Sequence, residues 1–324
     1  MNIEKTLYDK ETLVKMVSSM LRYFDNKENK NEIIKAAHTL MTRIKESSDK
    51  VELDSKLLES ILFIQNEDGT KNIVKDVFFE LKSIGADMSG VSFDNVNISG
   101  LYFNNLKNVE INIDRIPNKD ISKTSFNGVK ITGSLEGTKV NGTDFDGYIG
   151  DLTLNPQTVQ DKNLCHTHLN GININGSFDD VCVIGMHTEG FKGEIIIDPQ
   201  KVKDKNLSFV NFDGVILVGR YDEKSNTYED ACFDDCNLNS CSFKGCIGRA
   251  VINLDKIVPI LTLTNLTGTE LIGTGEYVYI SRTYYEDEDG NKIYLDKKKE
   301  LESEEKVKRP KSIFVKLRSK IRNK

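Results

Sequence analysis

The chain has 324 residues, and its 44 Lys and Arg against 50 Asp and Glu give a formal net charge of −6 at pH 7. No apolar run approaches the roughly 20 residues that a membrane-spanning helix needs. The first residues also lack the basic-then-apolar form of a secretory signal. We therefore expect a cytoplasmic protein with no transmembrane segment, although export without a signal stays open.

Residues 1–84 predict an α-helical segment. Apolar side chains recur there at helical spacing in four stretches. These are Leu13, Val14, Val17, Met20 and Leu21; Ile33, Ala36, Ala37, Leu40 and Ile44; Leu57, Leu58, Ile61 and Leu62; and Val74, Val77, Phe78 and Leu81. We expect a helical domain that caps the rest of the chain, with a separate partner-binding module as the alternative.

Residues 85–275 have a repeat of five. A large apolar residue stands at every fifth position in the clearest runs, as in Phe93, Ile98 and Phe103 or in Leu238 and Phe243. Two positions before each lies a small or apolar residue, with a polar residue between. This period is neither the 3.6 of a helix nor the alternation of a strand. It predicts a chain that turns a corner every five residues.

A longer repeat of 43 residues is superimposed on the first. It relates the segments 119–122, 162–165 and 205–208, which read KDIS, KNLC and KNLS. One such block holds eight five-residue faces, which corresponds to two four-sided coils. Internal repeats of this kind indicate a solenoid in which each coil contacts its neighbours.

These units resemble those of the pentapeptide-repeat proteins, which favour Ala or Cys, then Asp or Asn, then Leu or Phe. The resemblance covers roughly residues 86–273 and is most specific at 86–103 and 231–248. It implies a right-handed, four-sided parallel β-helix. Because an open β-helix exposes unpaired strand edges at its ends, the flanking segments are expected to cover them.

The cysteines could suggest a zinc site, but their spacing argues otherwise. Cys236, Cys241 and Cys246 occupy the small inward position of successive units, with Cys232 just before them. Structural zinc sites bring thiolates together through close pairs, whereas these side chains fall on successive sides of one coil. We expect packing residues, and six reduced thiols in all rather than a disulfide framework.

The histidines offer a weaker metal hypothesis. If each five-residue unit forms one face of a four-sided coil, His168 and His187 fall at the same outward position of adjacent coils. Asp144 falls at that position on the coil before, and His166 is nearby. Two imidazoles and a carboxylate about one strand spacing apart could bind a transition metal. The alternative is a solvated outward column, which we favour, so we predict no metal and no other cofactor.

An enzyme is not expected. Glycosidases on β-helices need converging carboxylates in a walled cleft, and this chain has one candidate loop, residues 220–230. Asp222 and Glu223 lie on it and are instead candidates for contact with a partner. No phosphate-binding glycine loop, nucleophile elbow or metal-binding helix motif is present.

Residues 276–324 form a third segment. The stretches 277–280 and 293–295 flank Asp289-Gly290, a strong turn signal, and so predict a β-hairpin. A final amphipathic helix is expected after Pro310. Its basic side carries Lys311, Lys316, Arg318, Lys320 and Arg322. This helix could dock or fray with a solvated charged side, mediate self-association, or lie on an anionic surface.

The charge is unevenly distributed along the chain. Residues 85–275 contain 16 Lys and Arg against 25 Asp and Glu, whereas residues 291–324 contain 13 against 5. We therefore hypothesise a protein-interaction or structural scaffold with an unidentified protein partner, and nucleic acid is an unlikely ligand of the acidic solenoid. The resemblance adds two alternatives: an acidic mimic of DNA that binds DNA gyrase or topoisomerase, and a secreted bacterial effector that binds a host protein.

Overall fold

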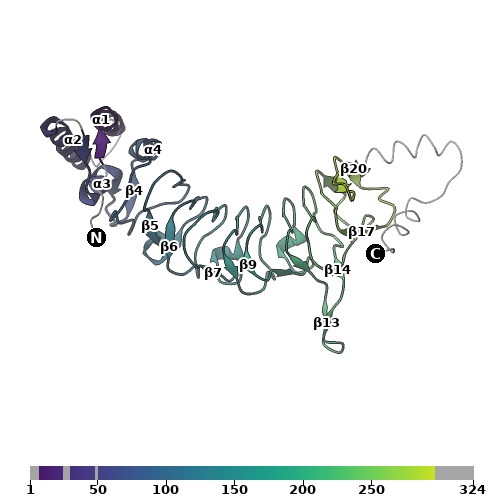
Figure 1. Cartoon of the computed structure of the whole chain (residues 1–324). Helices are drawn as coiled ribbons and strands as arrows, with labels where there is room; N and C mark the ends of the chain where they lie inside the picture. The colour runs from purple at the N-terminus through teal and green to yellow at the C-terminus, as the bar shows by residue number, and fades with distance from the viewer. Residues whose placement is uncertain (1–6, 25–29, 48–49, 296–324) are drawn as a thin grey trace. The chain divides into compact units, whose positions relative to one another are not determined.

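The computed structural model describes residues 7–24, 30–47 and 50–295. Their dominant feature is a β-solenoid of about nine turns, preceded by four α-helices (Figure 1). Strands of successive turns pair in parallel, which confirms the solenoid expected from the five-residue repeat. Contacts divide the chain into two compact units. The first is Met1–Asn163, Thr167–Ile174 and Gly190–Lys192, and the second is Leu164–His166, Asn175–Glu189 and Gly193–Lys324.

The helices lie in the first unit. They are α1 (Lys10–Phe24), α2 (Lys30–Glu46), α3 (Ser55–Leu62) and α4 (Lys75–Ser83). Two antiparallel strand pairs join them, and the apolar pattern did not predict these: β1 (Leu7–Asp9) with β2 (Lys50–Glu52), and β3 (Phe63–Gln65) with β4 (Lys71–Ile73). Helix α3 begins where the Asp54 side chain accepts a hydrogen bond from the Leu57 N–H, a typical N-cap.

The N-terminal elements cover the first coil of the solenoid. The Lys71 N–H of β4 donates to the Asn95 carbonyl, and the Asn97 N–H donates back to the Lys71 carbonyl. Phe78 of α4 meets the ring of Phe103 edge-on at 5.5 Å between centroids. Main-chain groups of the first coil at Asn95 and Asn97 are therefore paired with β4, and α4 places an aromatic side chain against the core.

Parallel strands continue the first unit. They are β5 (Glu110–Asn112), β6 (Lys130–Thr132), β7 (Thr153–Leu154) and β8 (Asn173–Ile174), with the boundary strand β9 (Lys192–Gly193). Three short 3₁₀ turns lie between them: η1 (Ile113–Arg115), η2 (Pro117–Lys119) and η3 (Gln160–Lys162). Ile111 pairs with Ile131 and Thr153 with Asn173. Inside, the rings of Phe103, Phe126 and Phe145 stack at 6.2 and 5.8 Å.

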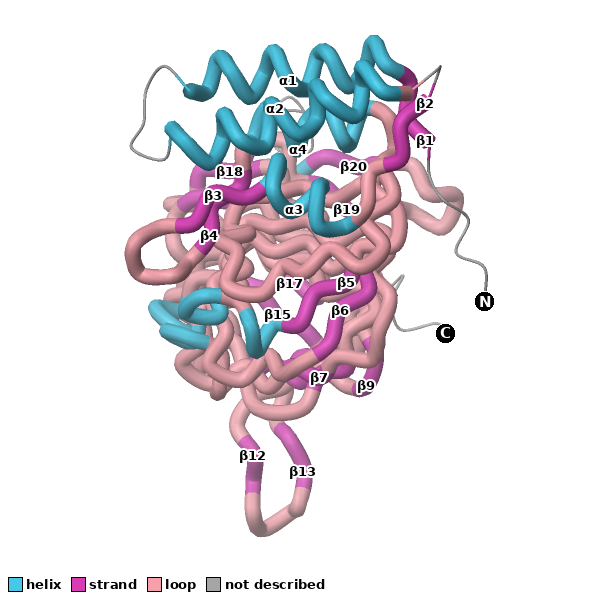
Figure 2. The backbone as a smooth tube through the Cα atoms, turned by 90° about the vertical axis from the view of Figure 1, so that its left-hand side faces the viewer, coloured by secondary structure: helices cyan, strands magenta, loops and turns pink. Residues whose placement is uncertain are grey.

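The second unit repeats this arrangement. Its parallel strands are β10 (Ile196–Ile197), β11 (Ile216–Leu217), β14 (Ala231–Cys232), β15 (Ala250–Asn253), β16 (Ile260–Thr262), β17 (Thr269–Ile272) and β18 (Tyr279–Ser281), with the 3₁₀ turn η4 (Lys203–Lys205). Between β11 and β14 a two-stranded hairpin, β12 (Tyr221–Asp222) with β13 (Thr227–Tyr228), projects away from the coils (Figures 1 and 2).

The C-terminal hairpin forms with a different first strand from the one predicted. Strand β19 (Tyr284–Glu286) pairs antiparallel with β20 (Lys292–Tyr294). The predicted partner, residues 277–280, instead contributes to β18, which pairs in parallel with β16. The predicted first strand of the hairpin is therefore wrong by one face of the solenoid. The outward Tyr277 and Tyr279 alternate with inward residues as a hairpin strand would, but they belong to the last face of the solenoid, and the hairpin begins after it.

A buried column of threonine hydroxyls ties the coils together. Each donates a hydrogen bond of 2.8–3.0 Å to a main-chain carbonyl of the preceding coil, and each side chain is fully buried. The residues are Thr124, Thr143 and Thr167 in the first unit and Thr264 and Thr283 in the second. Cys241 occupies the same position and directs its thiol at the Leu207 carbonyl. The inward position that these residues share therefore holds a small side chain. A hydroxyl or thiol there also donates a hydrogen bond to a main-chain carbonyl of the preceding coil.

The substitution Thr143→Val tests this role, because it keeps the shape but removes the donor to the Ile121 carbonyl. We expect the free energy of unfolding in urea to fall by about 1 kcal/mol, the net value of one buried hydrogen bond. Thr153→Val is the matched control, since Thr153 is exposed on β7, and it should change little. Equal effects of the two substitutions would contradict the role of the column.

Candidate interaction surface and side-chain clusters

An outward column in the first unit contains two of the predicted metal candidates. Successive bridges pair Tyr102 with Ser125, Ser125 with Asp144, and Asp144 with His168. The prediction that Asp144 and His168 are neighbours on adjacent coils is therefore confirmed. The structure adds Asp146: His168 Nδ1 lies 3.8 Å from Asp144 Oδ1 and 4.0 Å from Asp146 Oδ2. Counting faces missed Asp146 because it belongs to the following corner, not to the column.

The other two candidate histidines, His166 and His187, belong to the second unit, and the stacking of His187 beside His168 stays a prediction. His187 continues an outward column there and pairs with Asn211. His166 has a left-handed backbone with φ of 56°, and its ring lies over Gly185, where a Cβ atom would collide with it. Neither histidine belongs to the group formed by Asp144, Asp146 and His168.

Hydrophobic side chains form an outward column in the second unit. Ile196 pairs with Ile216, and Ile216 pairs with Ile247. Ile196 is 37% exposed, Ile216 half-buried and Ile247 52% exposed. The alternate residues of these strands, such as Ile197 and Leu217, are buried. Outward positions of a solenoid face water, so three aliphatic side chains in register on adjacent coils are not explained by folding alone.

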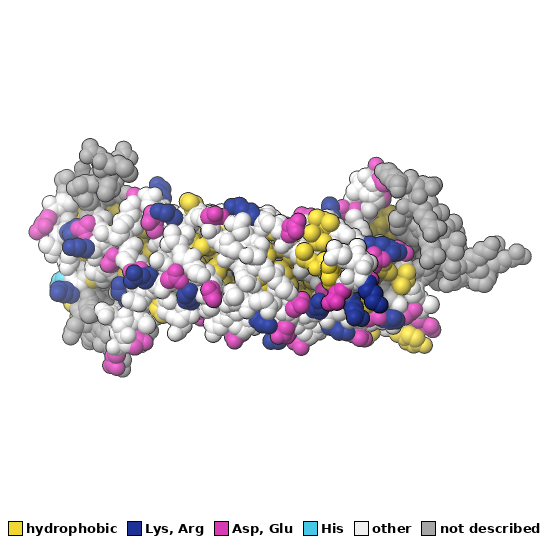
Figure 3. Space-filling view, turned by 90° about the horizontal axis from the view of Figure 1, so that it is seen from below, with side chains coloured by type: hydrophobic (Ala, Val, Ile, Leu, Met, Phe, Trp, Pro, Cys, Tyr) yellow, Lys and Arg dark blue, Asp and Glu magenta, His cyan; other side chains and the backbone are white. Residues whose placement is uncertain are grey.

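The hairpin β12–β13 begins directly after this column. Its two tyrosines, Tyr221 and Tyr228, pair across the strands with ring centroids 5.1 Å apart, and they are 40% and 51% exposed. The Tyr221 hydroxyl donates to the Asn226 side chain. Figure 3 shows hydrophobic side chains gathered over the part of the chain from which the hairpin projects. We call Ile196, Ile216, Ile247, Tyr221 and Tyr228 the isoleucine–tyrosine surface.

The two acidic candidates lie on the same hairpin. The Asp222 carboxylate accepts hydrogen bonds from the Lys224 N–H at 3.0 Å and the Ser225 hydroxyl at 2.8 Å. These bonds stabilise the charged form and lower the pKa of Asp222. Asp222 therefore shapes the turn, whereas Glu223 is exposed at the tip.

Many acidic side chains of the solenoid pair with a basic side chain from a neighbouring coil. The pairs Lys130–Glu110, Lys139–Asp120, Lys201–Asp179, Lys205–Asp235 and Lys256–Asp234 have N–O distances of 2.8–3.8 Å, and Arg249 contacts both Asp230 and Glu270. Such exposed pairs contribute little stability. Their consequence is that positive and negative groups alternate, as the visible face in Figure 3 shows.

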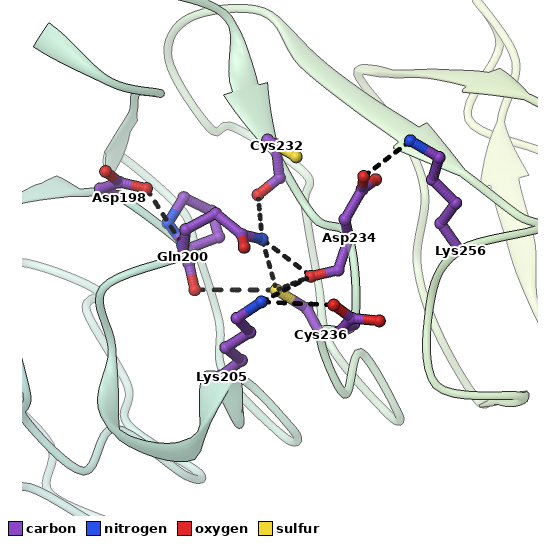
Figure 4. Close-up of polar contacts among 9 residues, drawn as sticks. Asp198, Gln200, Lys205, Cys232, Asp234, Cys236 and Lys256 are labelled. Atoms are coloured by element: carbon purple, nitrogen blue, oxygen red, sulfur yellow. Dashed lines mark hydrogen bonds and ion pairs between the residues drawn. The ribbon is translucent and has the colours of Figure 1, made fainter.

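A cluster of polar side chains connects the coil before the hairpin β12–β13 to the coil after it (Figure 4). The Gln200 amide donates to the carbonyls of Cys232 at 3.1 Å and Asp234 at 2.8 Å, and Lys205 reaches the Asp235 carboxylate at 3.4 Å. The Asp234 carboxylate in turn accepts from Lys256 at 2.8 Å. Because these contacts join the coil before the hairpin to the coil after it, this cluster is structural.

The cysteines follow the packing prediction in one respect and depart from it in another. Cys236 and Cys241 are buried and Cys246 is half-buried, whereas Cys232 is exposed. Burial raises the pKa of Cys236 to about 12 and that of Cys241 further still. The expectation of six reduced thiols is wrong at Cys165 and Cys182, which form a disulfide. Stacking brings them together, since the Leu164 N–H donates to the Cys182 carbonyl.

The remaining predicted site residues, Lys311, Lys316, Arg318, Lys320 and Arg322, lie outside the described residues. Among the helices that are described, none has the length and apolar character of a membrane span. Comparison with known proteins gives no family, no curated protein and no solved structure that matches this chain.

Alkylation of the thiols tests both cysteine assignments. With iodoacetamide at pH 8 the folded protein should be labelled fastest at Cys232, because burial raises the pKa of Cys236 and Cys241 and shields both from reagent. After unfolding without reductant, mass spectrometry should find four labelled cysteines, and six once reductant is added. Six labels without reductant, or labelling of Cys241 in the folded protein at the rate of Cys232, would contradict the assignments.

Proposed function

We propose that this protein is a non-catalytic scaffold of the pentapeptide-repeat type that binds another protein through the isoleucine–tyrosine surface. The observation that carries the proposal is the register of Ile196, Ile216 and Ile247 on the outside of adjacent coils. Outward positions elsewhere on the solenoid hold both polar residues, such as Asp144 and Asn211, and exposed apolar ones, such as Tyr279. Three aliphatic side chains in register on successive coils, next in sequence to an inserted hairpin, distinguish this column. An aliphatic column at this position favours contact with a second apolar surface.

The hairpin supplies the side chains that protein interfaces favour. Tyrosine is enriched among residues that dominate binding energy, because it buries a large rigid area and keeps a polar end. Tyr221 follows Ile216 by five residues along the chain, and the turn of the same hairpin carries the charged residues Glu223 and Lys224. An apolar centre with a charged rim is the usual anatomy of a protein–protein interface.

Several features support the finer description as a right-handed, four-sided helix of the pentapeptide type. Small side chains point inward at the positions that the repeat predicts, as at Ala231, Cys236 and Cys241, and all three are buried. Large apolar side chains at the centre of the units, such as Phe233 and Phe243, are buried too. Both properties are what the resemblance implies for that family.

The charge arrangement weighs against mimicry of DNA. A protein that imitates the nucleic acid needs a continuous negative stripe, because a partner that binds DNA recognises closely spaced phosphates. Here Lys130, Lys139, Lys201, Lys205 and Lys256 each lie against a carboxylate of the solenoid. Delivery into a host cell rests on the resemblance alone, and binding by the basic tail stays a prediction from sequence.

Two of the groups that could serve an enzyme have structural roles instead. The Asp222 carboxylate is engaged in its own turn, and the buried Cys241 has a pKa raised by desolvation. A raised thiol pKa leaves little thiolate at neutral pH, and thiolate is the nucleophile. These assignments support a binding role over a catalytic one.

Crosslinking from the hairpin tests the proposal. A photoreactive phenylalanine analogue in place of Tyr228 should capture one dominant protein in cells that produce this chain. With that protein purified, the double substitution Tyr221→Ser and Tyr228→Ser should weaken binding at least about 30-fold, the effect of losing about 2 kcal/mol from a hot spot. Excision of residues 221–228 with a short glycine linker should do the same, because the retained Glu229 is already hydrogen-bonded to Gly219 and Arg220 at the base of the hairpin.

Tyr102→Ser provides the matched control, since Tyr102 is an outward tyrosine of the first unit that is 58% exposed. It should leave the affinity unchanged. Equal binding by the wild type and the hairpin variants would contradict the proposal. Inhibition of gyrase supercoiling by wild-type protein, retained in the hairpin variants, would instead favour DNA mimicry.

A further inference from the structure

We propose that Asp144, Asp146 and His168 form a binding site for one divalent transition-metal ion, of which Zn²⁺ is the best match. The site lies on the outward column of the first unit and shares no residue with the isoleucine–tyrosine surface. One imidazole nitrogen and one oxygen from each carboxylate lie within 4.8 Å of one another. Two of the three ligands, Asp144 and His168, were predicted as neighbours from the sequence, and the tertiary structure adds the third, Asp146.

The backbone fixes the relative positions of the three residues. The parallel bridge between Asp144 and His168 sets them side by side on adjacent coils. Asp146 follows at the corner of the same coil as Asp144, and its N–H donates to Asp144 Oδ1 at 2.9 Å. This short turn places the two carboxylates on the same side of the chain. Asp144 and His168 are therefore positioned by the bridge between coils, and Asp146 by the short turn that follows Asp144.

The distances suit a shared ion better than a direct contact. At 3.8 and 4.0 Å, His168 Nδ1 is too far from Asp144 Oδ1 and Asp146 Oδ2 for a hydrogen bond. Bonds from zinc to nitrogen and oxygen are about 2.0–2.2 Å long, so two ligand atoms of one ion lie at most about 4.2 Å apart. Both distances fall within this limit, and small rotations of the side chains would bring them to tetrahedral values.

The charge of the group also calls for a cation. Elsewhere on the solenoid, carboxylates such as Asp120 and Asp234 pair with a lysine of a neighbouring coil. Within the described part of the chain, the ion pairs of Asp144 and Asp146 are those with His168. The two carboxylates therefore both lie near the imidazole of His168, and a divalent ion would balance their charge.

A supporting residue orients the first ligand. The Ser125 hydroxyl donates to Asp144 Oδ2 at 3.1 Å from the preceding coil. This bond leaves Oδ1 as the Asp144 oxygen that faces His168. Oδ1 accepts one hydrogen bond, from the Asp146 N–H, and as an ionised carboxylate oxygen it still has a lone pair for a metal ion. Such orienting partners tune metal affinity. His168, Asp144 and Asp146 are all partly exposed, so water can complete the coordination.

The ligand chemistry selects the class of ion. Imidazole favours zinc, copper, iron or nickel, whereas magnesium and calcium prefer all-oxygen sites. Three protein ligands leave a position for water, which zinc accepts readily. We therefore expect Zn²⁺ and Co²⁺ to bind and millimolar Mg²⁺ or Ca²⁺ not to displace them.

Calorimetry with the full chain, first dialysed against chelator, tests the site. Wild-type protein should take up about one Zn²⁺ with high affinity, and His168→Gln or Asp146→Asn should weaken this binding at least about tenfold, with Ser125→Ala weakening it less. His38→Gln is the matched control, because His38 is exposed on α2 and belongs to no group of possible ligands among the described residues, and it should leave binding unchanged. Circular dichroism checks that each variant is folded.

Co²⁺ distinguishes this site from the cysteines, because thiolate ligands give intense near-ultraviolet absorption and carboxylate and imidazole ligands do not. We expect visible bands without the thiolate band, lost in His168→Gln. Three outcomes would overturn the proposal: no binding of Zn²⁺ by the wild type at micromolar concentration, a thiolate band that persists in His168→Gln, or equal loss of binding in His38→Gln.

Discussion

The main-chain hydrogen bonds between successive coils are the constraint on which the rest of the structure depends. They fix which residue of one coil lies beside which residue of the next, as in the pairing of Asp144 with His168 or of Ile196 with Ile216. Side chains alternate between inside and outside along each short strand. Residues at equivalent positions of the repeat therefore stack on one another, and each such stack of side chains forms an inward or an outward column. Inward columns hold phenylalanine, threonine and cysteine, and the threonine hydroxyls reinforce the same coil-to-coil bonding that created the column.

The same constraint explains why the solenoid tolerates an inserted hairpin. Asn206 pairs with Asn237, 31 residues later, whereas Asp120 pairs with Lys139 after 19. The extra chain leaves the coil at Gly219 and returns at Glu229, where the two are hydrogen-bonded. Gln200 and Lys205 then bond to the returning coil. An insertion at a corner therefore adds surface without shifting the core, so a binding element can be attached to a rigid support.

Outward columns are the places where chemistry can accumulate on such a fold. A side chain that is distant in sequence becomes a neighbour at about one strand spacing, so any two coils can assemble a group that neither contains alone. The isoleucine–tyrosine surface and the cluster of Asp144, Asp146 and His168 both arise in this way. In each group, one five-residue unit contributes a side chain, and units of adjacent coils bring the other side chains next to it. The cross-coil ion pairs follow the same rule, and they divide the acidic surface into small neutralised patches.

The sequence alone determined the solenoid, the inward positions of Cys236 and Cys241 and the adjacency of Asp144 and His168, because each follows from a period that sterics impose on every coil. It did not determine which residues of a corner approach a column. The carboxylate of Asp146, the ring of His166 over Gly185 and the disulfide of Cys165 with Cys182 depend on the local backbone at turns, where the repeat says nothing about direction. The C-terminal hairpin was misplaced for a related reason: the alternation of Tyr277 and Tyr279 is the same in a hairpin strand and in a solenoid face, and only the pairing partner, β16 rather than β20, distinguishes them.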